Sequence, residues 1–271
     1  MRTRLVVVLA AAAVAGLSVT SPAGATHSWG GYHWARTANP FTLKVGANLT
    51  SGWTSYYNAT VSDWNAGAVL QLAPVAGTSN KRCSAVTGTV QVCNGRYGNN
   101  GWLGLASISI TGGTHITKGT AKMNDTYFDT STYNNPNERE HVMCQEVGHT
   151  FGLDHQSTDG SSQNTCMDYF SNTGANATST VSTKPNQHDF DELATIYAHF
   201  DSSTTIAAGT SSAAAGNEVG DDRSTWGQEV ERGAHNEYSV FVRDFGGGQK
   251  VITHVTWANG SDSPGASHGR V

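Results

Sequence analysis

Alternating apolar and polar positions predict a series of short strands in this chain. The run 41–45 alternates, as the residues of a half-buried strand do. Comparable runs separated by glycine-containing turns predict three more strands, which are 87–92, 103–110 and 116–124. The middle part of the chain is therefore expected to form a sheet.

Apolar residues at helical spacing predict three helices. The first covers 53–70, with an apolar face made of Tyr57, Val61, Trp64, Ala68 and Leu72. The second is expected to have Asn137 as its cap, acidic residues in its first turn, and an end near Gly152. The third starts near 186, and its apolar face is made of Phe190, Leu193, Ile196, Tyr197 and Phe200.

The second predicted helix carries the residues with the clearest chemical pattern. Gln145 and His149 are four apart, so their side chains lie on one helix face and can converge on one metal ion. Glu146 stands beside that face, where a carboxylate can serve as the general base for an activated water. Gly152 can end the helix in a left-handed conformation and return the chain, so that His155 approaches the same ion. Three protein ligands with one open position are typical of catalytic zinc.

This spacing resembles the zinc signature of the metzincin metallopeptidases, H-E-x-x-H-x-x-G-x-x-H, with Gln145 at the position of the first ligand histidine. The order of elements over 27–202 is also similar to metzincin catalytic domains, in particular the matrixin-like ones. The resemblance implies an α+β fold with a twisted mixed sheet, long helices that include an active-site helix, and a bound Zn²⁺. It also implies that Glu146 is catalytic and that His149 and His155 bind the metal.

Gln145 is the departure from that pattern. An amide oxygen is a weak zinc ligand, so Gln145 is expected either to bind the metal weakly or to support the other ligands. His141 cannot replace it at the same ion, because it lies eight residues from His149, about 12 Å along a helix axis.

Two downstream residues extend the resemblance. Met167 stands where metzincins place a methionine-containing turn beneath the metal as an apolar floor. Tyr169 stands where astacins and serralysins carry a tyrosine that contacts the metal or the developing oxyanion, so it is a second catalytic candidate. The alternative is that Tyr169 only packs.

Four cysteines allow three disulfide pairings. Nearness in the sequence favours Cys83 with Cys93, which leaves Cys144 with Cys166. A four-cysteine zinc site is the alternative, but C-x-x-C pairs are lacking. A bond between Cys144 and Cys166 would join the motif helix to the turn that contains Met167.

The first residues have the pattern of a secretory signal peptide. Arg2 and Arg4 precede an apolar run over 5–19 and a small-residue cleavage site, which predicts a signal peptide over 1–25. A membrane anchor is the alternative, but the apolar run is short. Loss of the two arginines changes the formal charge from −5 to −7, which argues against nucleic acid or anionic membranes as partners. A secreted, extracellular monomer is expected, without membrane attachment after signal cleavage.

Composition divides the mature chain into three parts. The expected catalytic domain covers 26–202 and is followed by a flexible linker rich in Ser, Thr, Ala and Gly over 203–222. The last part, 223–271, contains two alternating runs, 238–243 and 250–257, that predict a β-hairpin. This hairpin region either packs on the catalytic domain or forms a small module of its own.

The sequence therefore predicts a secreted zinc metalloendopeptidase that acts on proteins or peptides. From the resemblance, the substrate is expected to lie extended along the strand at 101–110 and to pair with it backbone to backbone. The alternative is an inactive relative that serves as a secreted binding protein. Gln145 motivates this alternative, and the presence of Glu146 opposes it.

Overall fold

A computed structural model describes residues 27–78, 82–157, 159–206 and 217–258. The expected signal peptide and residues 207–216 of the expected linker lie outside the described residues. No helix in the described ranges is long and apolar enough to cross a bilayer.

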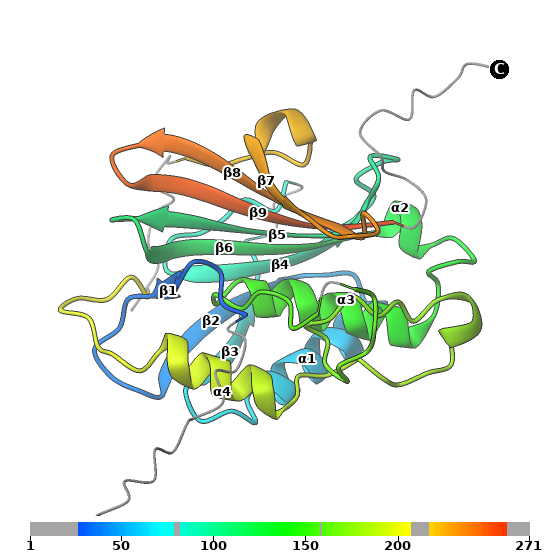
Figure 1. Ribbon diagram of the computed structural model, residues 1–271, viewed down its shortest axis with the longest axis horizontal. Coiled ribbons are helices and arrows are strands. Elements are labelled where there is room, and N and C mark those ends of the chain that lie inside the picture. Colours follow the sequence, from blue (N-terminus) through cyan, green and yellow to red (C-terminus); the bar gives the residue numbers. More distant parts are fainter. Residues whose placement is uncertain (1–26, 79–81, 158, 207–216, 259–271) are drawn as a thin grey trace, which may run out of the picture.

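One mixed sheet organises the described chain (Figure 1). Its strands follow the order β3-β2-β4-β6-β5-β9-β8-β7, and β1 pairs with β6 beside this path. The strands are β1 (His33–Trp34), β2 (Phe41–Asn48), β3 (Leu70–Ala76), β4 (Thr89–Gly95), β5 (Trp102–Thr111), β6 (His115–Asn124), β7 (Gln228–Arg232), β8 (Tyr238–Gly246) and β9 (Gln249–Trp257).

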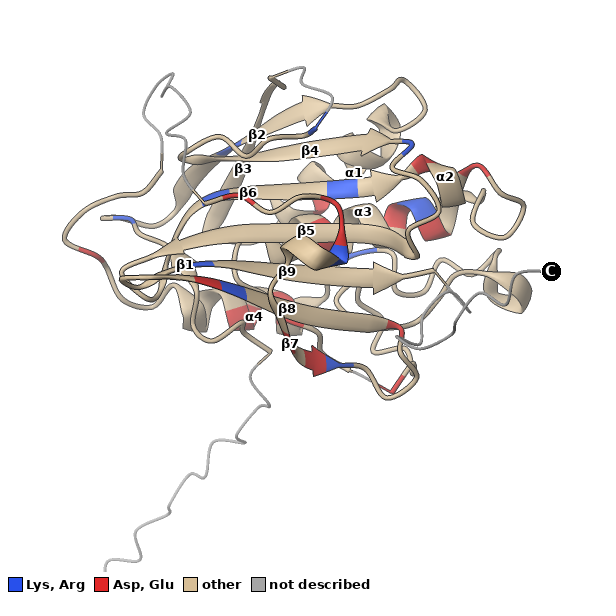
Figure 2. Cartoon of the chain, turned by 90° about the horizontal axis from the view of Figure 1, so that it is seen from above, with Lys and Arg blue, Asp and Glu red and all other residues tan. Residues whose placement is uncertain are grey.

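The sheet has a parallel half and an antiparallel half. Strands β1, β2, β3, β4 and β6 pair in parallel, whereas β5, β7, β8 and β9 pair antiparallel with their neighbours. The C-terminal strands β7, β8 and β9 thus continue the sheet formed by the preceding strands, and β9 pairs with β5 (Figure 2). Part of the expected linker also packs on this sheet, since Lys122 of β6 reaches the Asp221 carboxylate at 2.5 Å.

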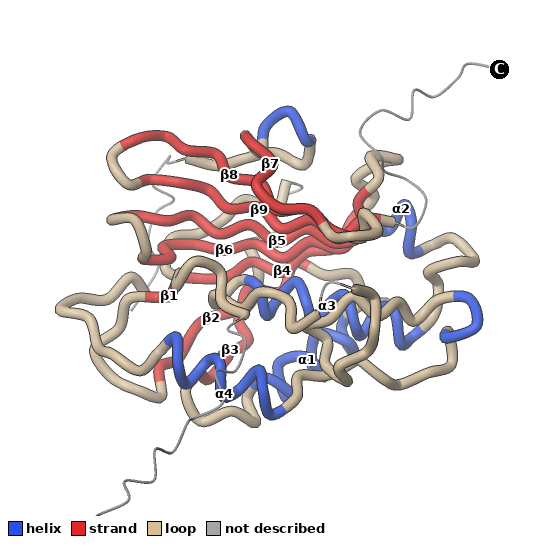
Figure 3. The backbone as a smooth tube through the Cα atoms, in the orientation of Figure 1, coloured by secondary structure: helices blue, strands red, loops and turns tan. Residues whose placement is uncertain are grey.

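The three longer helices lie on one side of the sheet (Figures 1 and 3). They are α1 (Thr54–Trp64), α3 (Pro136–His149) and α4 (Gln187–Ile196). The short helix α2 (Asp125–Phe128) and the 3₁₀ turns η1 (Gly174–Asn176) and η2 (Arg223–Thr225) complete the described elements. Helix α3 packs between α1 and strands β5 and β6, which brings the motif residues beneath the sheet. The α+β class with a mixed sheet is therefore confirmed.

Two apolar clusters stabilise this arrangement. The larger one fills the space between the sheet and the helices, and includes Val45, Ile108, Val147 and Phe151. The smaller one joins β5 to the C-terminal strands and to η2, and its buried members are Trp102, Leu105, Trp226, Phe241, Val255 and Trp257. The C-terminal strands thus contribute to both clusters, since Tyr238, Val240 and Ile252 belong to the larger one.

Two helix boundaries differ from the sequence prediction. Helix α1 ends at Trp64, because the Asn65 side chain bonds both the N–H and the carbonyl of Leu72 and turns the chain into β3. The α3 cap is Asn135, not Asn137: its side chain accepts from the Glu138 N–H, and a proline follows it in the first turn.

Candidate metal centre

Helix α3 brings the motif to the middle of the molecule. The helix ends at His149, and Gly152 follows with φ +104°, a conformation that favours glycine. A Cβ on Gly152 would also meet the Tyr32 carbonyl oxygen. The chain turns back at this point and brings the His155 ring within 4.6 Å of the His149 ring, centroid to centroid.

The third imidazole comes from β9, not from α3. The His254 ring stacks on that of His149 with centroids 3.9 Å apart, and lies 4.3 Å from that of His155. One ring nitrogen from each of the three residues lies within 4.8 Å of the others, close enough to share a metal ion. His254 has no counterpart among the sequence-predicted ligands. The feature of the sequence that points to His254 is a histidine at an inward-facing position of an apolar strand.

Several polar atoms at this centre are buried without a hydrogen-bond partner among the described residues. They are His149 Nε2, His155 Nε2, His254 Nδ1 and Glu146 Oε2. Burial of an unpaired polar atom is costly, and nearly all such atoms in folded proteins are paired. Three imidazole nitrogens and a carboxylate oxygen are also groups that bind zinc. The residues of the centre therefore fit a zinc ion.

The protonation states of the three histidines suit metal binding. His149 Nδ1 donates to the Leu153 carbonyl at 2.8 Å, which leaves the lone pair on Nε2. Burial lowers the pKa of His149 to about 4, and it holds the pKa of His155 and His254 well below the usual range. All three rings are therefore neutral near pH 7, as ligands must be.

Glu146 is completely buried at this centre. Burial raises the pKa of its carboxyl to about 8, and the hydrogen bond from Thr256 opposes this rise. Thr256 lies two residues beyond His254 in β9, and its hydroxyl is 2.7 Å from Glu146 Oε1. Strand β9 thus supplies both an imidazole and a partner for the predicted base.

The Gln145 side chain is occupied by other hydrogen bonds. Its Nε2 donates to the carbonyls of Cys166 and Asp168 at 3.0 and 2.8 Å, and its Oε1 accepts from Thr256 at 3.0 Å. Gln145 is therefore not among the three clustered nitrogen ligands of the described form, and its role as a metal ligand stays a prediction.

Met167 and Tyr169 both lie against the centre. Met167 is fully buried, and its Sδ is so close to α3 that a Cβ on Gly148 would approach it to 2.6 Å. The Tyr169 hydroxyl contacts His155 Nδ1 and lies 3.2 Å from His254 Nε2. Tyr169 thus reaches the imidazole cluster, and its ring also stacks on Tyr238 of β8.

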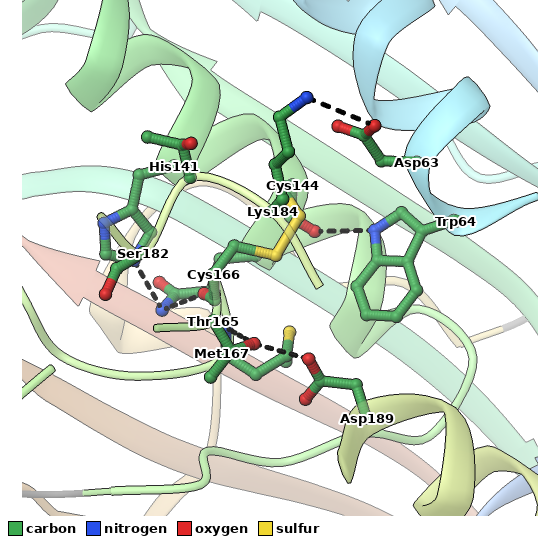
Figure 4. Close-up of a disulfide and its surroundings, with 12 residues drawn as sticks. Asp63, Trp64, His141, Cys144, Thr165, Cys166, Met167, Ser182, Lys184 and Asp189 are labelled. Carbon is green, nitrogen blue, oxygen red and sulfur yellow. Dashed lines mark hydrogen bonds and ion pairs between the residues drawn. A yellow bond between two sulfur atoms is a disulfide. The ribbon is translucent and has the colours of Figure 1, made fainter. Parts of the chain in front are cut away.

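The structure contains the two disulfides that nearness in the sequence favours, Cys83–Cys93 and Cys144–Cys166. The second joins α3 to the turn before Met167 (Figure 4). Trp64 of α1 donates from Nε1 to the Cys144 carbonyl at 3.2 Å on the same side. The helix and the turn are therefore fixed relative to each other at Gln145 and Met167, the residues that follow the two cysteines.

Comparison with known proteins gives little guidance. No family model and no curated protein matches the chain. Among solved structures, the chain is similar to high choriolytic enzyme 1, a hatching enzyme zinc-protease from the medaka fish Oryzias latipes. The TM-score is 0.34 and the sequence identity 10%, over 61% of this chain and 94% of that chain.

Proposed function

We propose that the protein is a secreted, zinc-dependent peptidase. The observation that carries the proposal is the cluster of His149, His155 and His254, each with a buried, unpaired nitrogen, together with the buried, unpaired oxygen of Glu146 on the same helix as His149. Such a donor set beside one buried carboxylate is the composition of a catalytic zinc site rather than of an apolar core.

Each residue of the metal centre would have a distinct role in catalysis. In the described form, His149, His155 and His254 would hold the metal, and zinc, when bound, would supply Lewis acidity for a peptide carbonyl and for water. Glu146 would accept the proton of the attacking water and deliver it to the leaving amine, for which a pKa above that of an ordinary carboxyl is suited. Tyr169 would stabilise charge near His155, which its hydroxyl contacts, and Met167 would support α3 at Gly148.

The third nitrogen ligand in the described form is assigned to His254 in place of Gln145. Zinc content and affinity of purified full-length protein test this assignment. We expect about one tightly held zinc per chain at this centre, a loss of affinity of at least tenfold in His254→Ala, and a smaller change in Gln145→Ala. Equal affinity in wild type and His254→Ala would show that His254 is not a ligand.

Activity on an unfolded protein substrate tests the peptidase itself. Glu146→Gln is expected to keep the metal and lose activity by a factor of 100 or more, on the order of a general base's contribution. The matched control is Thr195→Val, a substitution at an exposed position of α4, which should keep both the metal and the activity. Loss of the metal together with the activity would point to a structural role for Glu146.

The second candidate is a catalytically inactive binding protein that keeps a metzincin-like fold. The burial of the metal centre beneath β9 favours this candidate. Glu146 and His149 have no exposed surface, and β9 pairs along the strand where a peptide is expected to bind. A protein that binds zinc but cleaves nothing, even after β9 has been released, would support this candidate and contradict the peptidase.

A further inference from the structure

A second group of imidazoles lies away from this centre, where the N-terminal strand meets the chain after α4. It comprises His33 of β1, His115 at the start of β6, and His199 and Asp201 after α4. Ligand atoms of His33, His115 and Asp201 lie within 4.8 Å of one another. His33 Nε2 is 3.2 Å from His199 Nε2, so the fourth residue faces the same point.

The hydrogen bonds around Asp201 leave one of its oxygens to these rings. The backbone N–H and the guanidinium Nη1 of Arg36 both donate to Oδ2 at 3.1 Å. The other oxygen, Oδ1, lies 3.1 Å from His115 Nε2 and 3.5 Å from His33 Nε2. Arg36 therefore orients the carboxylate without competing for Oδ1.

The tautomer of His33 directs the lone pair of its Nε2 into the cluster. His33 Nδ1 donates to the Gly31 carbonyl at 2.8 Å, so a neutral ring presents its Nε2 lone pair to the Oδ1 lone pairs of Asp201. A metal ion between these two acceptors would bind both of them, and an N–H of His199, 3.2 Å from His33 Nε2, is the metal-free alternative. The 3.2 Å between the ring nitrogens of His33 and His199 is close to the spacing of about 3.3 Å expected for two imidazoles on one tetrahedral zinc.

We propose that His33, His115, His199 and Asp201 form a second site for a divalent transition metal such as zinc. Four protein ligands leave no open position, so the site is structural. It would join β1, β6 and the chain after α4. The His115 and His199 side chains are 33% and 54% exposed, which lets the ion exchange with solvent.

Zinc stoichiometry tests this site independently of peptidase activity. After loading with Zn²⁺ and removal of free metal, wild type is expected to hold about two zinc ions per chain, and His115→Ala and His149→Ala about one each. His199→Ala changes a more exposed ligand of the same site and should weaken zinc binding there. His235→Ala, an exposed histidine elsewhere, should keep both ions.

Thermal unfolding supplies a second readout. Added Zn²⁺ should raise the midpoint of His149→Ala, which keeps only the new site, and should not raise that of His149→Ala/His115→Ala. The proposal is overturned if His115→Ala holds as much zinc as wild type. It is also overturned if the midpoint of His149→Ala responds to pH but not to zinc, because a proton would then fill the position.

A different observation, the pairing of β5 with β9, carries a second inference that rests on the proposed function. Strand β9 pairs with β5 from Trp102 with Trp257 to Ile110 with Lys250. It therefore uses the backbone groups that an extended substrate would need. We infer that residues 217–258 form an intrinsic inhibitory segment of the peptidase.

The side chains of β9 support this inference. His254 and Thr256 lie on the same face of the strand, and both side chains point into the metal centre. The Thr256 hydroxyl is hydrogen-bonded to the side-chain oxygens of both Glu146 and Gln145. Release of β9 would free the base and the Gln145 amide oxygen, and Gln145 lies on the helix face of His149. The predicted weak ligand would then be available in the open form.

A reversible cross-link in the full chain tests the inhibition. Ser107 of β5 and Thr253 of β9 are direct partners with hydroxyl oxygens 3.1 Å apart, so Ser107→Cys/Thr253→Cys should form a disulfide that locks the two strands. A cleavage site for a sequence-specific protease is inserted within 207–216. After cleavage and dilution, we expect faster amide exchange in β5 and a rise in activity of at least tenfold. The oxidised locked variant should show neither change until mild reduction.

The outcomes distinguish the proposed inhibitory segment from the proposed peptidase activity. If the uncut, oxidised protein is already as active as the cut one, the segment is not inhibitory but the peptidase stands. If exchange in β5 increases on cleavage and no activity follows, the peptidase is wrong. If cleavage of the reduced protein changes neither exchange nor activity, the inhibitory segment is wrong.

Discussion

Glu146 places an ionisable carboxyl where water is excluded, so folding stability should depend on its charge. Burial raises its pKa to about 8, compared with about 4.3 in an unfolded chain. The folded state therefore binds the proton more tightly. The corresponding stability is fully present below the unfolded pKa and is lost as the pH rises through the folded pKa.

This linkage predicts a pH-dependent difference between two metal-free proteins. Glu146→Gln should become progressively more stable relative to wild type between about pH 5 and 8. Urea unfolding of chelator-treated protein at several pH values measures this difference. Thr195→Val at an exposed position of α4 removes no ionisable group, so it is the control and should show no such trend. A difference that stays flat over this range would contradict the buried position of Glu146.

Gly104 of β5 faces the same carboxyl. A Cβ on this residue would meet Glu146 Oε1 and approach Val142 Cγ1 to 2.7 Å, although the backbone conformation of Gly104 is open to any residue. We expect Gly104→Ala to lower the free energy of unfolding by about 1–3 kcal/mol, as overpacking does. Gly52→Ala, with open space around its Cα, should be near neutral. Equal unfolding free energies for the two variants would show that α3 and β5 are not in this contact.

At the scale of elements, the Cys144–Cys166 disulfide is the link between α3 and the Met167 turn. It closes a loop with a sequence separation of 22, against 10 for Cys83–Cys93. In the loop-entropy model, its removal costs about 3.4 kcal/mol and removal of the shorter loop about 2.7 kcal/mol. The double alanine variants of each pair, compared by urea unfolding, measure both values.

Zinc affinity separates the two disulfides further. Cys144 and Cys166 lie directly beside Gln145 and Met167, whereas the other pair joins β4 to the chain before it. We expect only the loss of Cys144–Cys166 to weaken zinc binding. An equal effect of both removals on zinc affinity would mean that the disulfide acts through overall stability alone.

Elements with strong local patterns were predictable from the sequence, and those set by distant contacts were not. The strands at 103–110 and 116–124 and the motif helix correspond to β5, β6 and α3. Strand β3 was not predicted, because Leu70 and Leu72 also fit the spacing of the preceding helix. Its Pro74 is tolerated since β3 is an edge strand, a fact that only the completed sheet supplies.

At the scale of the whole molecule, the candidate metal centre was also predictable only where local sequence patterns determine it. His149 and His155 are recognisable because helix geometry and one glycine turn bring them together. His254 is 99 residues beyond His155, and only the pairing of β9 with β5 brings it there. Its own segment reads as an ordinary alternating strand, so a sequence pattern could not distinguish a ligand from a buried histidine.

This long-range closure predicts that metal binding stabilises two distant segments together. If zinc joins His149 of α3 to His254 of β9, amide exchange in both elements should slow on zinc addition, whereas β7, at the sheet edge, should change little. At zinc concentrations 1,000 times the dissociation constant, linkage gives about 4 kcal/mol of added stability. In His254→Ala, the effect should persist in α3 and disappear in β9. Protection of α3 alone in the wild type would mean that β9 covers the centre without binding the metal, and the third ligand would then have to come from elsewhere.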